Sequence, residues 1–169
     1  MEPTAGIETS HQSMLGLRKV VPAEGDIDTT TVDIIAIHGL DTESPQTWIY
    51  KKDGGRVVNW LEDRDMLPAS IPNARIYTYN WNARAFNDAP VQTLLGYADN
   101  LLALVEGEQV PNPRPIVFIA SCFGGLILAE AINRAAVQNS PYQRVLHNTA
   151  GMIFLATPFR GSDAAEPAK

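Results

Sequence analysis

The segment ASCFGG, residues 120–125, contains the side chain best suited to nucleophilic chemistry. It stands between a short apolar run and a helical pattern, which predicts a sharp strand–turn–helix connection. A nucleophile at such a turn needs small residues two positions before and after it, because the backbone is crowded there. Cys122 has Ala120 and Gly124 at these positions. Ser121 would have two bulky residues instead, so the spacing favours Cys122.

Backbone N–H groups could stabilise an oxyanion beside this cysteine. Gly39 and Leu40 follow the first strong apolar run, and Phe123 follows the cysteine directly. We expect their N–H groups to form an oxyanion hole. The N-terminus of the following helix is expected to stabilise a thiolate at Cys122. An ordinary strand-ending turn and a cysteine buried as a small apolar residue are the alternative interpretations.

Short apolar runs that alternate with helical patterns must position these groups. Such runs predict buried parallel strands, and a 3.6-residue apolar period predicts helices. The alternation indicates an α/β class with a predominantly parallel sheet flanked by helices. The predicted strands of this kind are Val32–Ile37, Ala74–Tyr79, Pro115–Ala120 and Gly151–Ala156, and a further short strand is predicted over Leu15–Val21. The predicted helices are 91–106, Gly124–Val137 and the shorter Trp60–Met66.

A proton-transfer partner for Cys122 is harder to find. Ligands of a parallel sheet bind beyond the carboxyl ends of its strands. His147 precedes a strand and should therefore lie at the opposite edge, and His11 lies in the N-terminal tail. His38 ends a strand, where its ring would order the oxyanion loop. Asp163 follows the last strand at the correct edge and is a candidate acid, although a solvated loop carboxylate is the alternative.

Composition limits the class of protein. The chain has 169 residues, a net charge of −6 and 45% hydrophobic residues, which suits one folded domain. We expect a disordered tail over 1–13, a domain over 14–163 and a short tail over 164–169. The acidic balance argues against nucleic acid as a partner. No cofactor or metal motif, secretory signal or transmembrane segment is evident, so a cytoplasmic protein is expected.

Several motifs together resemble the α/β-hydrolase superfamily. The chain looks most like the lipase-like serine-esterase modules found alone or at the N-termini of fungal NACHT- and ankyrin-type immune receptors. The resemblance covers about residues 32–163. It rests on Val32–Leu40, Thr47-Trp48, Trp60-Leu61, Ala74–Ile76, the elbow Phe118–Leu126 and the ending Gly151–Ser162.

Two departures from the family pattern matter. The family usually has Gly-His-Ser-Leu-Gly-Gly at the elbow, whereas Cys122 stands here at the serine position. The family's acid and histidine follow strands that this chain does not reach, so the fold is expected to be truncated after the sixth family strand. The apolar strand Gly151–Ala156 would then lie at an edge, where it could pair with another copy.

Three functional hypotheses follow from these observations. The first is a hydrolase of carboxylic esters, lipids or thioesters that uses Cys122 as its nucleophile. The second is a catalytically weakened hydrolase-like module that signals or binds partners. The third is a fragment of a larger receptor-type protein, whose remaining strands carry the acid and base. The elbow favours the first hypothesis, and the missing histidine favours the others.

Overall fold

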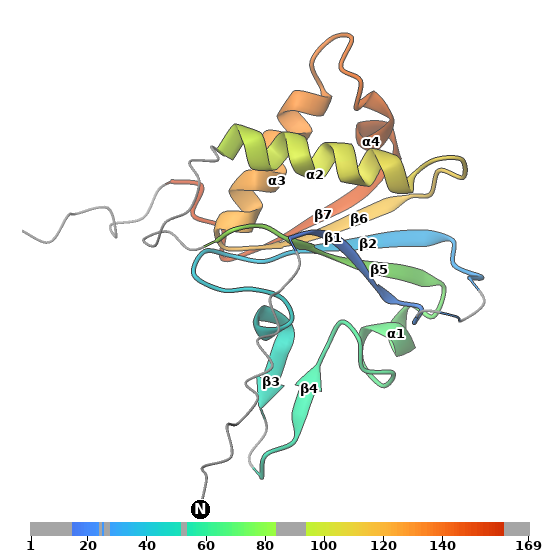
Figure 1. The fold of residues 1–169 in the computed structure, drawn as a ribbon, viewed down its shortest axis with the longest axis vertical. Coiled ribbons are helices and arrows are strands. Elements are labelled where there is room, and N and C mark those ends of the chain that lie inside the picture. Colours follow the sequence, from blue (N-terminus) through green and yellow to red (C-terminus); the bar gives the residue numbers. More distant parts are fainter. Residues whose placement is uncertain (1–14, 24, 26–27, 52–53, 84–93, 161–169) are drawn as a thin grey trace, which may run out of the picture.

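A mostly parallel sheet forms the centre of the molecule. The computed structural model describes residues 15–23, 25, 28–51, 54–83 and 94–160. Five strands pair in the order β1-β5-β2-β6-β7 (Figure 1). β2 is parallel to β5 and β6, β6 is parallel to β7, and β1 is antiparallel to β5. Their bounds are Gly16–Val21 for β1, Val32–Ile37 for β2, Ala74–Asn80 for β5, Ile116–Ser121 for β6 and Thr149–Leu155 for β7.

Helices cover one face of this sheet, and a smaller layer covers the other. The first layer contains α2 (Leu94–Glu108), α3 (Phe123–Ala135) and α4 (Gln143–Asn148). The second contains the short helix η1 (Gln46–Trp48), the antiparallel strands β3 (Ile49–Lys51) and β4 (Val57–Asn59), and α1 (Leu67–Ser70). Figure 1 shows the two layers above and below the sheet.

The central strands are buried on both sides, as their continuous apolar runs predict. Ile35 and Phe118 pack with the helices in one core, whereas Ile34 and Ile119 pack with Trp48 in the other. Successive side chains of β2 therefore point to opposite faces of the sheet and belong to two different cores. This arrangement confirms the predicted α/β class and the five predicted strands.

One predicted helix is wrong. The segment Trp60–Met66 forms turns, and α1 begins only at Leu67. The side chain of Asn59 accepts a hydrogen bond from the Leu61 N–H (3.1 Å), and the Asp63 carboxylate accepts one from the Asn59 N–H (3.1 Å). Such side-chain bonds offer the backbone an alternative to helical pairing.

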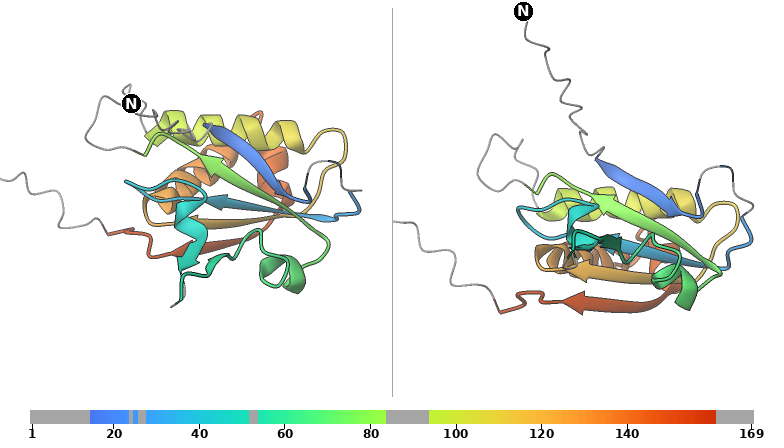
Figure 2. Two further views of the ribbon diagram at one scale, coloured as in Figure 1. Left: turned by 60° about the horizontal axis from the view of Figure 1, so that its bottom comes forward. Right: turned by 90° about the horizontal axis from the view of Figure 1, so that it is seen from below.

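The two edges of the sheet are formed by β1 and β7. The predicted N-terminal strand pairs with β5 and lies at the edge opposite β7 (Figure 2). Among the described residues, β6 is the strand that pairs with β7. The predicted tails 1–13 and 164–169 and the first residues of the predicted helix 91–106 lie outside the described residues.

Candidate active site

Cys122 lies at the turn between β6 and α3, in a backbone conformation that L-residues rarely adopt. Its φ is 49° and its ψ is −125°, and its side chain is exposed. Two hydrogen bonds fix the turn: the Cys122 N–H donates to the Leu155 carbonyl (2.8 Å), and the Gly125 N–H donates to the Cys122 carbonyl (3.0 Å). The structure thus has the strained strand–turn–helix geometry that presents a nucleophile in hydrolases.

Glycines allow three segments to meet at this turn. A Cβ atom at Gly124 would stand 2.4 Å from the His38 carbonyl oxygen and 2.8 Å from that of Ile37. A Cβ atom at Gly125 would stand 1.9 Å from the Thr157 hydroxyl oxygen. The start of α3 therefore packs directly on the ends of β2 and β7. This packing explains why the elbow requires two consecutive glycines.

Gly39 brings the loop after β2 against the cysteine. An added Cβ atom at Gly39 would lie 3.7 Å from the Cys122 Sγ. The Gly39–Leu40 peptide therefore starts beside the candidate nucleophile. Phe123 is the first residue of α3, where a backbone N–H has no acceptor within the helix. These positions suit oxyanion donors, and their catalytic role stays a prediction.

His38 supports this loop from within the core. It is fully buried, and its ring stacks on Trp81 with centroids 5.5 Å apart. The backbone N–H of Trp81 donates a hydrogen bond to the His38 Nε2 at 3.3 Å. Because Nε2 is the acceptor, the proton of the neutral ring lies on Nδ1. Nδ1 then donates to the Gly39 carbonyl at 2.9 Å. Burial lowers the pKa of His38, against the smaller raising effects of the Gly39 hydrogen bond and of Glu43.

His147, the other described histidine, does not lie by the cysteine. His147 belongs to α4 and directly precedes β7, whose carboxyl end approaches Cys122. The length of β7 separates the two ends by roughly 20 Å. His11 and the candidate acid Asp163 lie outside the described residues. In the part of the chain that the structure describes, no histidine with a free ring nitrogen lies beside Cys122.

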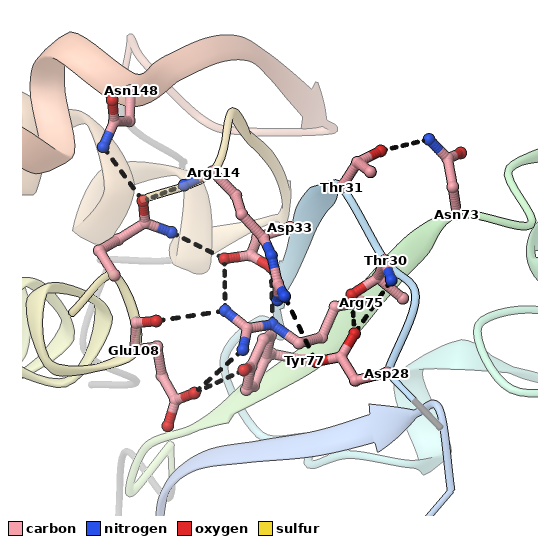
Figure 3. A network of polar contacts seen from close by, with 11 residues as sticks. Asp28, Thr30, Thr31, Asp33, Asn73, Arg75, Tyr77, Glu108, Arg114 and Asn148 are labelled. Carbon is pink, nitrogen blue, oxygen red and sulfur yellow. Dashed lines mark hydrogen bonds and ion pairs between the residues drawn. The ribbon is translucent and has the colours of Figure 1, made fainter. Parts of the chain in front are cut away.

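A buried polar network occupies the opposite end of the strands (Figure 3). Asp33, at the start of β2, is 1% exposed. Arg75 donates to both of its carboxylate oxygens, at 2.8 and 2.9 Å, and the Gln109 side chain donates to one of them at 2.7 Å. Arg114 approaches the same carboxylate at 3.8 Å. These bonds compensate a charge that would otherwise be costly to bury.

The network ties the sheet to the end of α2. The side-chain oxygen of Gln109 accepts hydrogen bonds from the backbone N–H of Arg114 (2.9 Å) and from the side-chain amide of Asn148 (3.1 Å). Tyr77 donates to the Glu108 carboxylate at 2.5 Å, and burial, more than this bond, raises the pKa of Tyr77. The sequence analysis missed this network, because its members are spread over four separate segments. An aspartate inside an apolar strand was the one signal that could have indicated it.

Among the described residues, no group of three or more His, Cys, Asp or Glu side chains could hold a metal ion. No helix in the same part of the chain is long and apolar enough to cross a membrane.

The strand order, the flanking helices and the turn at Cys122 define an α/β-hydrolase fold of the lipase-like kind. The solved structure of the mature lipase BlEst2 from Bacillus licheniformis is similar, with a TM-score of 0.53 and 16% identity. That similarity covers 87% of this chain and 49% of the lipase. No protein-family model matches the chain.

Curated relatives in sequence are Protein SERAC1 from Danio rerio and from Homo sapiens. They are 25% and 26% identical to this chain over an alignment of 151 positions, and each match covers 79% of the chain. The chain spans less than a quarter of the length of these relatives, 23% and 22% respectively. Together with the match to the lipase structure, these distant relatives support a lipase-like α/β-hydrolase domain.

Proposed function

We propose that the chain is a hydrolase-like domain in which Cys122 attacks the carbonyl carbon of a carboxylic ester, lipid ester or thioester. The observation that carries the proposal is the conformation of Cys122. A non-glycine residue with positive φ between a strand and a helix is strained, and such strain persists where it serves function. The lipase-like fold, with its resemblance to a known lipase, supports an ester as the substrate class.

The chemistry follows from the groups around the thiol. The Cys122 thiolate forms a bond to the carbonyl carbon, and the carbonyl oxygen takes up the negative charge. The N–H groups of Gly39, Leu40 and Phe123 are the proposed donors to that oxyanion. Collapse of the tetrahedral intermediate breaks the bond to the leaving group, which departs as an alkoxide or thiolate, takes a proton from the solvent and leaves an acylated Cys122.

Deacylation is expected to be the weak step. General-base assistance typically contributes ~10²–10⁴-fold, and both nitrogens of His38 are already engaged. Water therefore lacks a free histidine base among the described residues that could activate it against the acyl-enzyme. We expect a burst of acylation with slow turnover.

Intact-mass spectrometry after incubation with a p-nitrophenyl ester tests the proposal directly. Cys122 is the single cysteine in the chain, so an acyl adduct on a thiol is assigned without ambiguity. The adduct and a stoichiometric burst of nitrophenol should appear in the wild type and vanish in Cys122→Ala. Absence of any adduct, or an adduct that survives Cys122→Ala, contradicts the proposal. Rapid steady turnover would instead reveal a base outside the described residues.

The second candidate is a hydrolase-like interaction module. The occupied ring of His38 favours it, because a fold that retains the elbow without a base can still bind esters or partners. A chain that binds ester analogues through Cys122 but never becomes acylated would support this function over the first.

A further inference from the structure

Trp81 directly follows β5 and lies between the two segments that carry the proposed oxyanion donors. It is 6% exposed. Its ring stacks on His38, with centroids 5.5 Å apart and planes 9° apart, and it also contacts the ring of Phe123 at 5.5 Å. His38 precedes Gly39 and Leu40 at the end of β2, and Phe123 begins α3. One indole therefore contacts both sides of the proposed oxyanion hole.

Two hydrogen bonds attach Trp81 to His38, one to its ring and one to its backbone. The backbone N–H of Trp81 donates to the His38 Nε2 at 3.3 Å, and the indole Nε1–H donates to the His38 carbonyl oxygen at 3.0 Å. The first bond selects the ring tautomer that carries its proton on Nδ1. The second holds the carbonyl oxygen that a Cβ atom at Gly124 would approach to 2.4 Å. Trp81 thus fixes His38 where the loop after β2 meets the start of α3.

The fixed ring of His38 determines the direction of the Leu40 N–H. Nδ1 donates to the Gly39 carbonyl oxygen at 2.9 Å, and this carbonyl belongs to the same peptide unit as the Leu40 N–H. The peptide bond is trans, so the N–H points away from the C=O. The Leu40 N–H is therefore turned away from the buried ring. Without the bond from Trp81, either ring nitrogen could carry the proton, and the Gly39 carbonyl would lose its defined donor.

A further contact, from Tyr97 in α2, holds Trp81 in place. The two rings meet edge to face with centroids 4.9 Å apart. The Tyr97 hydroxyl donates to the carbonyl oxygen of Asn82, the residue after Trp81, at 3.0 Å. The indole is thus fixed by contacts from β2, α2 and α3, and its position does not depend on the loop after β5 alone.

We propose that Trp81 is a positioning residue for the oxyanion hole. It sets the tautomer and the place of His38, and through them the direction of the Leu40 N–H relative to the N–H of Phe123. This inference rests on the proposed function of Cys122 and deepens it. Trp81 acts through His38 and Phe123 rather than on the reacting atoms, so its loss should affect only reactions in which an oxyanion forms.

Two reactions of the same thiol separate this role from a general structural one. Acylation of Cys122 by a p-nitrophenyl ester passes through an oxyanion. Alkylation by iodoacetamide does not, because the thiolate displaces iodide from a saturated carbon. Cys122 is the single cysteine of the chain, so intact-mass spectrometry assigns both products. The ratio of the two rate constants reports stabilisation of the oxyanion and cancels changes in the exposure of the thiol.

Trp81→Phe keeps an aromatic ring and the backbone N–H but removes the indole N–H. We expect the ratio of acylation to alkylation to fall roughly 10-fold, less than the ~10²–10³-fold that loss of a whole donor costs. Trp48→Phe is the matched control, because Trp48 is 2% exposed and its Nε1–H donates to the Ser44 hydroxyl at 2.9 Å in the other core. The control should lose comparable stability toward urea and keep the wild-type ratio.

An unchanged ratio in Trp81→Phe, or an equal fall in Trp48→Phe, overturns the inference and leaves the proposed function standing. A wild type that iodoacetamide alkylates but the ester never acylates contradicts the proposed function, and this inference with it.

NMR of the wild type labelled with ¹⁵N-histidine gives a test that needs no folded Trp81 variant. The signals of His38 are assigned by their loss in His38→Gln. At neutral pH its ring should carry the proton on Nδ1, as the bond from the Trp81 N–H requires. A proton on Nε2 overturns the inference, whereas acylation of Cys122 in the same sample would still support the proposed function.

Discussion

Gly39 and Cys122 approach so closely that a Cβ atom added at Gly39 would stand 2.8 Å from the Cβ atom of Cys122. Real Cβ atoms do not tolerate such a distance, so one of the two backbones must move to accept a side chain. The contact between Gly39 and Cys122 therefore holds the loop after β2 against the turn after β6. The arrangement couples the proposed oxyanion donors to the proposed nucleophile.

Gly39→Ala should separate these two segments. We expect labelling of Cys122 by a thiol reagent and acylation by an ester to change markedly, because the loop is displaced from the turn. Gly107→Ala is the matched control, since a Cβ atom there would meet nothing within 4 Å. Acylation equal to the wild type in both variants would show that the contact does not position the site.

Cys122→Gly should stabilise the fold while abolishing reactivity. Glycine adopts positive φ without the strain that a side chain causes, which is of order 1–3 kcal/mol at such positions. We expect a higher midpoint of urea unfolding for Cys122→Gly than for Cys122→Ala, although both lose the thiol. If the two variants unfold at the same urea concentration, the turn stores no strain.

Asp33→Ala should strongly destabilise the protein. The substitution leaves the largely covered Arg75 and the buried Gln109 without their shared partner, which typically costs about 3–5 kcal/mol. Asp65→Ala is the control, because its ion pair with Arg56 is 65% and 66% exposed and should contribute less than about 1 kcal/mol. Urea denaturation of both variants measures the difference. Similar losses in the two would show that the network contributes little.

The stability of the fold should depend on His38 below neutral pH. Burial holds the pKa of His38 below its ordinary value of 6.5. The unfolded chain therefore binds this proton first as the pH falls. The free energy of unfolding is retained above about pH 6.5 and decreases below it, until the folded state is protonated as well.

His38→Gln removes this titration, so the loss of stability between about pH 7 and pH 5 should be smaller than in the wild type. Its absolute stability will be lower at both values, because the bonds to Gly39 and Trp81 change. His147→Gln, at an exposed position, serves as the control for the histidine substitution. An unchanged slope in His38→Gln would contradict the role assigned to burial.

The sequence by itself determined the class of fold and the position of the elbow. Apolar runs and 3.6-residue periods are local signals, and they placed all five strands of the main sheet within a few residues. The small residues Ala120 and Gly124 on either side of Cys122 reflect crowding within one short turn. This signal is local, so it could also be interpreted without coordinates. Trp60–Met66 was predicted wrongly, since side-chain bonds to the backbone overrode its helical pattern.

Only the tertiary structure decided which distant groups meet. The contact of Gly39 with Cys122 joins residues 83 positions apart, and the bonds around Asp33 join β2 to segments near 75, 109 and 114. No local pattern encodes such meetings, because they depend on strand order and register. The same holds for the His38 Nε2, which became engaged only when β2 and the loop after β5 were brought together. Sequence assigns residues to elements, and packing decides which of their polar groups remain free to react.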